Sequence, residues 1–227
     1  MPTWFSRLSR IRPLHGFSGS VTKYWYYYGL NFSESERELS INKLKTLARK
    51  KAKARRYASH LDIGPEASQQ ISNFIEEFLL DREGCEIVAV YMPIQTEIDI
   101  TPVISKLRKQ GKILCLPVIA SETKPLHFRI WNENSILIED EFRVLTPVAG
   151  EVTEPDLILC PLLSFDARGY RLGYGGGFYD RTIEHLLKTK SIFTLGCAYS
   201  DQEAVEPLPV EKYDRQLDAV VTENGFT

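Results

Sequence analysis

The sequence lacks the features that mark several large classes of protein. No apolar run approaches the roughly 18 residues that a membrane-spanning helix needs. The formal net charge of −2 gives no electrostatic basis for bulk nucleic-acid binding, which normally requires a basic face. The four histidines are scattered along the chain, so neither a Ser-His-Asp triad nor a zinc site can be proposed. We therefore expect no membrane partner and no nucleic-acid partner.

The four cysteines contain no C-x-x-C pair, and each lies in a short apolar segment typical of a strand. They are Cys85, Cys115, Cys160 and Cys197. Reduced, buried cysteines are typical of a cytoplasmic protein, and a catalytic thiol is the weaker interpretation. We expect all four to lie in the core of a cytoplasmic protein.

Residues 1–33 differ in composition from the rest of the chain. They contain basic residues and no acidic residue, and they end in an aromatic run from Tyr24 to Tyr28. Such a segment is typical of an organelle transit peptide, and it is equally typical of an arm that packs on the protein through its aromatic rings. We favour a cytoplasmic protein with an N-terminal extension, residues 1–33, and a single α/β domain, residues 34–227, a size common for one domain.

The order of apolar patterns predicts the fold class. Period-3.6 patterns indicate helices, and short Val/Ile-rich runs indicate buried strands. The predicted helices are 35–59, 65–80, 101–110 and 179–188, and the predicted strands are 85–91, 112–118, 156–163, 192–198 and 219–222. Residues 126–131 and 136–145 indicate a more exposed, hairpin-like excursion. Strand, helix and strand in succession imply parallel pairing, so we expect a three-layer α/β fold, with a mostly parallel sheet and helices on both faces.

The glycine-rich segment from Ser164 to Asp180 is the most informative part of the sequence. It follows a buried strand and precedes a helix, which is where open parallel sheets bind ligands. Its glycines, at positions 173, 175, 176 and 177, let backbone N–H groups approach a ligand closely, and such donors at a helix N-terminus favour phosphate. Arg171 adds a phosphate partner and Asp180 a possible metal ligand. The segment is neither a Walker loop nor a dinucleotide fingerprint, and a merely flexible turn stays open as an alternative.

Three further segments carry polar groups. A basic stretch, Lys43–Arg56, places residues 45, 49, 53 and 56 on one helical face; it indicates a solvated surface or an RNA-binding helix as readily as a ligand site. The turn Tyr91–Asp99 follows the first strand, where it can line a ligand site; alternatively, Glu97 and Asp99 only cap the next helix. Asp214, before the last strand, is either a metal ligand or a turn residue.

In this order, the four segments resemble the 5-formyltetrahydrofolate cyclo-ligase family over about residues 43–222. The run Arg171–Asp180 is similar to the family's R-L-G-x-G-x-G-[YF]-Y-D motif. The resemblance implies Mg-ATP-dependent conversion of 5-formyltetrahydrofolate to 5,10-methenyltetrahydrofolate, with release of ADP and phosphate. In that chemistry the formyl oxygen attacks the γ-phosphate, a folate nitrogen closes the ring, and phosphate leaves. We expect a monomer that acts on this small molecule, with ATP as co-substrate and Mg²⁺ as cofactor.

The resemblance also implies roles for individual residues. Those implied to be catalytic are Arg171 and Tyr179. Those implied to bind ATP are Lys45, Arg49, Arg171, Leu172, Gly173, Tyr174, Gly175, Gly176, Gly177, Phe178 and Tyr179. Those implied to bind the folate are Met92, Glu97, Tyr174 and Phe178. The implied Mg²⁺ ligands are Asp180 and Asp214, hard oxygen donors of the kind that Mg²⁺ prefers.

Two features depart from the family pattern. Some members carry basic residues in the glycine loop, at the positions of Tyr174 and Gly176, so this loop brings fewer cations to the γ-phosphate. The N-terminal extension exceeds what the resemblance explains. Two other functions remain as alternatives: another phosphate-binding α/β enzyme, such as a sugar-phosphate isomerase, which would need no ATP, and an RNA-associated protein that uses the basic helix.

Overall fold

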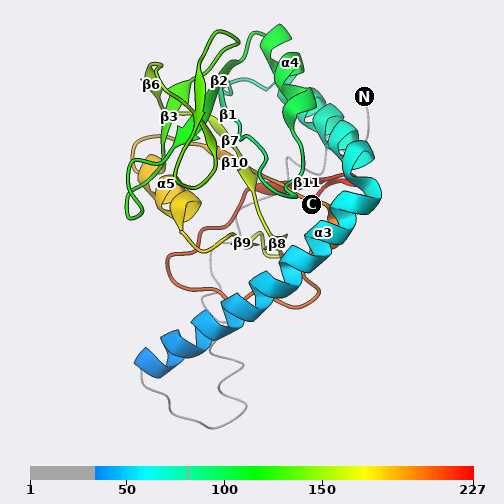
Figure 1. Ribbon diagram of the computed structural model, residues 1–227, viewed down its shortest axis with the longest axis vertical. Coiled ribbons are helices and arrows are strands. Elements are labelled where there is room, and N and C mark those ends of the chain that lie inside the picture. Colours follow the sequence, from blue (N-terminus) through cyan, green and yellow to red (C-terminus); the bar gives the residue numbers. More distant parts are fainter. Residues whose placement is uncertain (1–33, 81) are drawn as a thin grey trace. The chain divides into compact units, whose positions relative to one another are not determined.

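The computed structural model describes residues 34–80 and 82–227 of the chain (Figure 1). The predicted N-terminal extension, residues 1–33, lies outside the described residues. The chain divides into two units, residues 1–40 and Ile41–Thr227. The sheet and the cavity lie in the second unit. In the described part of the chain, no helix is both long enough and apolar enough to cross a membrane.

The centre of the second unit is an eight-stranded, mostly parallel sheet, as predicted. The strand order is β12-β11-β10-β7-β1-β2-β3-β6. Its five central strands are parallel: β1 (Ile87–Ala89), β2 (Ile113–Val118), β7 (Leu157–Pro161), β10 (Phe193–Cys197) and β11 (Ala219–Thr222). Antiparallel strands flank them: β3 (His127–Ile130), β6 (Val152–Thr153) and β12 (Gly225–Phe226). The four cysteines are buried and free in this unit, which confirms the expected core position.

Helices cover both faces of the sheet. The helix α4 (Thr101–Lys109) connects β1 to β2, and α5 (Phe178–Leu186) follows the strand β7 and leads to β10. These two connections run in opposite directions along the sheet, and right-handed crossovers then place the two helices on opposite faces (Figure 1). The second half of the long helix α3 (Glu34–Leu80) packs beside α4, where Glu76 pairs with Lys106 at 2.7 Å. The arrangement is the predicted three layers.

The helix prediction was wrong at one point, because α3 is continuous where two helices were expected. It runs through Pro65, which removes one backbone donor and normally ends or kinks a helix. Figure 1 shows α3 change direction part-way along its length, the usual effect of an internal proline. Buried residues on both sides of the proline, Ala52 and Arg56 before it and Ile71 and Ile75 after it, pack into the same unit. This packing outweighs the local signal for a break.

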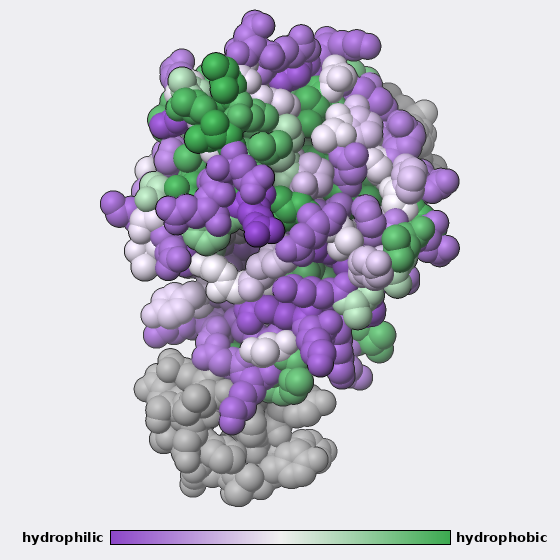
Figure 2. Space-filling model, in the orientation of Figure 1, coloured by the Kyte–Doolittle hydropathy of each residue, from purple (hydrophilic) through white to green (hydrophobic). Residues whose placement is uncertain are grey.

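The predicted excursion divides between two sheets, so the expectation that residues 126–131 and 136–145 form a hairpin-like unit was wrong. Its first half is β3, which pairs with β2 and β6 in the main sheet, whereas β4 (Leu137–Glu139) pairs with β5 (Leu145–Pro147) in a separate two-stranded sheet. Several apolar side chains in and beside these strands are exposed, including Ile136, Ile138, Val148 and Val152. Figure 2 shows hydrophobic side chains gathered in this area of the surface. As expected, this part of the chain is less buried than the parallel strands.

The topology places a switch point beside β1. This strand begins the parallel sheet, with β2 on one side and β7 on the other, so the connections diverge between β1 and β7. In open α/β sheets, ligands bind at the carboxyl ends of the strands at such a switch point. The turn after β1 and the segment after β7 therefore open onto the same space.

Candidate active site

The glycine-rich loop lies between a short hairpin and the N-terminus of α5. The hairpin pairs β8 (Ser164–Phe165) with β9 (Arg171–Leu172), and the loop runs from there to Gly177, the N-cap residue of α5. Gly175 and Gly177 have φ of +114° and +65°, conformations that side-chain-bearing residues rarely adopt. A Cβ on Gly176 would lie 2.7 Å from the Phe178 ring. The glycines therefore define one specific loop shape, and flexibility alone does not explain them.

The N-terminus of α5 has no side-chain cap. The first N–H groups of a helix have no partner within the helix, and they carry part of the positive end of the helix dipole. A glycine-rich loop that leads into uncapped N–H groups favours an anion at this position. The loop geometry therefore fits the phosphates of a nucleotide.

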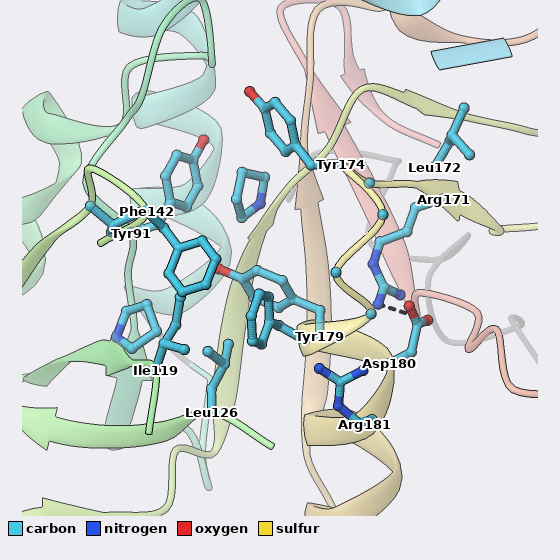
Figure 3. A pocket seen from close by; sticks show the side chains of 18 of the residues that line it. Tyr91, Ile119, Leu126, Phe142, Arg171, Leu172, Tyr174, Tyr179, Asp180 and Arg181 are labelled. Atoms are coloured by element: carbon cyan, nitrogen blue, oxygen red, sulfur yellow. Dashed lines mark hydrogen bonds and ion pairs between the residues drawn. The ribbon is translucent and has the colours of Figure 1, made fainter. Parts of the chain in front are cut away.

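A cavity of about 840 Å³ opens beside this loop. Tyr91 and Met92 line it from the turn after β1, Ile119 from the end of β2, and Phe142 from the excursion. Figure 3 shows aromatic and apolar side chains on one side of the cavity and the pair of Arg171 and Asp180 on the other. The structure brings every predicted site residue to this cavity: Lys45, Arg49, Met92, Glu97, Arg171, Leu172, Gly173, Tyr174, Gly175, Gly176, Gly177, Phe178, Tyr179, Asp180 and Asp214.

Cations from α3 reach the cavity edge. The Nζ of Lys45 lies 2.6 Å from a Glu211 carboxylate oxygen and 2.7 Å from Oδ2 of Asp214, and the side chain is 7% exposed. The Nε of Arg49 donates to the Gly173 carbonyl at 3.0 Å, which ties the helix to the glycine loop. Part of the basic stretch therefore points inward, which leaves a weaker basis for an RNA-binding helix.

The two predicted metal carboxylates are both ion-paired. Asp180 Oδ1 accepts from Arg171 at 2.9 Å and from the backbone N–H of Arg215 at 2.9 Å. In the part of the chain that the structure describes, Oδ2 of Asp180 accepts no hydrogen bond, whereas both oxygens of Asp214 are held by Lys45. No group of three or more metal-ligating side chains occurs among the described residues. One or two carboxylates suit Mg²⁺ when phosphates supply the remaining oxygens.

A buried carboxylate occupies the opposite corner of the cavity. Glu97 is 5% exposed, and its Oε2 accepts from the backbone N–H of Ile94 at 3.0 Å. Burial raises the pKa of Glu97 to about 7, against the lowering effects of the Ile94 hydrogen bond, the Arg56 charge and a hydrogen bond from Tyr174. The interpretation of Glu97 as a helix cap was wrong, because Asp99 instead accepts from the N–H of Thr101 at the start of α4.

Tyr179 lines the cavity from the first turn of α5. Burial raises the pKa of its phenol well above the usual value, and the nearby Cys160 and Glu97 raise it further. The phenol therefore keeps its proton at neutral pH and can donate a hydrogen bond into the cavity.

The chain matches one known protein family over most of its length. The model of the 5-formyltetrahydrofolate cyclo-ligase family matches residues 41–223, which include every residue of the predicted site. The chain belongs to this cyclo-ligase family. The motif resemblance over residues 43–222 is thereby confirmed.

Individual cyclo-ligases agree with the family match. The 5-formyltetrahydrofolate cyclo-ligase of Escherichia coli (strain K12) is 36% identical over 141 residues, which make up 60% of this chain and 76% of the relative. The solved 5,10-methenyltetrahydrofolate synthetase of Aquifex aeolicus is 30% identical, with a TM-score of 0.67 over 81% of this chain and 91% of that one. The Mycoplasma pneumoniae synthetase, 24% identical with a TM-score of 0.63, covers 79% of this chain and 98% of that one and shows the same fold.

The structure places cations beside Tyr174 of the glycine loop. Lys53 Nζ lies 5.4 Å and the Arg56 guanidinium carbon 5.3 Å from the centre of the Tyr174 ring. Arg56 is 1% exposed and also donates to the Tyr174 hydroxyl. Positive charge therefore reaches this part of the cyclo-ligase cavity from α3.

Sequence reasoning missed several residues that line the cavity. Phe142 lies in the turn between β4 and β5, and its ring meets Phe178 edge-on with centroids 5.6 Å apart. Asp140 and Val144, from the same excursion, also line the cavity. The turn that carries Phe142 is tight, because Arg143 beside it has a positive φ of 61°. Nothing in the sequence pattern indicated that this turn folds over the glycine loop.

Proposed function

We propose that this protein converts 5-formyltetrahydrofolate to 5,10-methenyltetrahydrofolate with ATP and Mg²⁺, releasing ADP and phosphate. The observation that carries the proposal is the cavity itself, which gathers all the predicted nucleotide, folate and carboxylate residues at the carboxyl ends of β1 and β7 in a member of the cyclo-ligase family. A volume of about 840 Å³ is in the range of small-molecule and cofactor sites.

In this proposal, the glycine loop holds the phosphates of ATP. The surroundings of the loop support this assignment. A Cβ on Gly175 would lie 3.3 Å from the guanidinium carbon of Arg49, so a cation lies directly beside the loop. Lys45 and Arg49 add positive charge from α3. Phosphoryl transfer depends mainly on positioning and on neutralising charge, so few acid–base groups are needed.

Asp180 and Asp214 are the residues that would hold Mg²⁺. The donor set fits, because Mg²⁺ is usually bound through one or two carboxylates together with substrate phosphates. When bound, the ion neutralises charge on the phosphates. Arg171 and Tyr179 complete the proposed catalytic group: Arg171 orients Asp180 through their ion pair, and the protonated Tyr179 hydroxyl offers a hydrogen-bond donor.

The folate would occupy the aromatic side of the cavity. We assign its contacts to Met92, Glu97, Tyr174 and Phe178, which line this cavity. The carboxylate of Glu97 can accept from two neighbouring N–H groups of the pterin, and burial strengthens such charge-assisted bonds. The formyl oxygen would then attack the γ-phosphate, a neighbouring folate nitrogen would close the ring, and phosphate would leave with the formyl oxygen.

The proposal includes the organisation of the whole chain. We infer a cytoplasmic monomer with one α/β domain, residues 34–227, preceded by an extension, residues 1–33. Neither membrane nor nucleic acid is a partner in this proposal.

An absorbance assay tests the function. The protein, Mg-ATP and 5-formyltetrahydrofolate are mixed, and the near-ultraviolet absorbance of the methenyl product is recorded. The absorbance should rise with all components present and stay flat when ATP is omitted. A rise that does not depend on ATP would contradict the proposed ATP-dependent reaction.

A further inference from the structure

Arg56 is a buried arginine that the proposed mechanism does not use. Its side chain is 1% exposed, although guanidinium groups keep their charge in proteins and are costly to bury without partners. Two of its hydrogen bonds go to neutral groups: Nε donates to Thr96 Oγ1 at 3.2 Å, and one terminal nitrogen donates to the Leu162 carbonyl at 3.3 Å. Neither partner compensates a full positive charge.

The two other partners of Arg56, Glu97 and Tyr174, both line the active-site cavity. One terminal nitrogen lies 3.8 Å from Oε1 of Glu97, and the other donates to the hydroxyl of Tyr174. At 3.8 Å the pair with Glu97 is an ion pair and not a direct hydrogen bond. Arg56 therefore connects the turn after β1, which holds Glu97, to the glycine loop, which holds Tyr174.

Among the ionisable groups around Glu97, the charge of Arg56 acts to lower the pKa of Glu97. The ionisable groups that face Glu97 are Arg56 from α3, Tyr174 from the glycine loop, Tyr91 from the end of β1 and Tyr179 from α5. The pKa values of all three tyrosines are raised above the usual value, first of all by burial, so the phenols are neutral at physiological pH. Of these four groups, Arg56 is the cation that favours the ionised form of Glu97 against burial.

We infer that Arg56 is a positioning residue of the folate subsite: its guanidinium favours the ionised form of the Glu97 carboxylate and ties it to Tyr174 of the glycine loop. The inference rests on the proposed function in one respect, because it takes Glu97 as the acceptor for the pterin N–H groups. A carboxylate that protonates loses half of its acceptor capacity and presents an O–H where the pterin also donates. Folate binding should then depend on Arg56 even though Arg56 does not line the cavity.

The direct test is a titration of Glu97 in the ligand-free protein. Carbon-13 NMR follows its carboxyl carbon, assigned with Glu97→Gln, in the parent and in Arg56→Gln. Glutamine retains a donor for the Leu162 carbonyl but removes the charge. The parent should titrate near pH 7, and Arg56→Gln should move the midpoint upward by at least about one pH unit, as the loss of an opposite charge at this range does. An unchanged midpoint overturns the inference.

A neighbouring arginine provides the matched control. Arg55 lies one position earlier on α3 and donates to the Glu203 carbonyl and the Ser164 hydroxyl, away from Glu97. Arg55→Gln should leave the Glu97 midpoint where the parent has it. If Arg56→Gln does not fold, Arg56→Met takes its place, because it removes the charge and keeps an apolar stem of similar length. A Glu97 midpoint that stays at the parent value in Arg56→Met also overturns the inference.

Folate affinity separates this inference from the proposed function. Calorimetric titration with 5-formyltetrahydrofolate between pH 6 and pH 9 should show weaker binding on the acid side of the Glu97 midpoint. In Arg56→Gln the same loss should begin at a higher pH, and raising the pH should recover the affinity. A Glu97 midpoint that moves without a matching change in folate affinity would leave the role of Arg56 intact and overturn the assignment of Glu97 to the pterin.

Discussion

Gly175→Val perturbs the part of the site on which the nucleotide assignment depends. The φ of Gly175 is +114°, a conformation that a β-branched residue avoids, and we expect a strain cost of about 1–3 kcal/mol. The new side chain would also begin 3.3 Å from the guanidinium carbon of Arg49, which would have to move and loosen its bond to the Gly173 carbonyl. The variant should therefore lose both the loop shape and one cation, and ATP affinity should fall at least about tenfold, roughly 1.4 kcal/mol.

Gly225→Val is the matched control. Gly225 has nearly the same φ, +111°, but no atom of the described residues lies within 4 Å of its Cβ position, and it is the first residue of β12, outside the cavity. Both variants should unfold at lower denaturant concentration than the parent, and circular dichroism must show both folded at the assay temperature. Calorimetry with a non-hydrolysable ATP analogue should then find weaker binding in Gly175→Val alone. Parent-like affinity in folded Gly175→Val would mean that the phosphates lie elsewhere.

Three further predictions concern the carboxylates. Glu97→Gln should weaken folate binding by about 1–3 kcal/mol in calorimetry and leave ATP affinity nearly unchanged; an equal loss for both ligands would contradict the assignment. Burial raises the pKa of Glu97 from 4.5 to about 7 in the folded protein, so the contribution of this group to the free energy of unfolding is present below about pH 4.5 and is lost as the pH rises through 7. Urea unfolding at several pH values should show the free energy of unfolding fall over this range in the parent, and fall less in Glu97→Gln. Asp214→Asn should raise the Mg²⁺ concentration needed for half-maximal turnover. The control Glu211→Gln removes the other carboxylate partner of Lys45 and should leave that concentration unchanged. Excess chelator should stop turnover of the parent.

The local sequence predicted the parallel sheet and the glycine loop because both have strong local causes. Strands such as Leu157–Pro161 are continuous apolar runs, and buried parallel strands need that pattern. The glycine loop follows one of these strands after a short hairpin, so its place at the carboxyl end of the sheet follows from the chain order. Gly111, with φ of +79°, ends α4 where the sequence predicted that the helix would stop.

The features that the sequence did not predict depend on contacts between distant segments. Pro65 favoured a helix break locally, and burial along the face of α3 on both sides of it overrode that preference. Arg56 was one cation of a basic run, and its environment is set by Leu162 and Tyr174, more than 100 positions away in the chain. Phe142 reaches the cavity through the small β4–β5 sheet, whose orientation no local pattern encodes.

One reaction tests the proposed function most directly. Methenyl absorbance and phosphate release are recorded together while the protein turns over 5-formyltetrahydrofolate with Mg-ATP. The account predicts equal amounts of methenyl product and phosphate throughout the reaction, and neither product when the folate or ATP is left out. Phosphate without methenyl product, or methenyl product without phosphate, would contradict it.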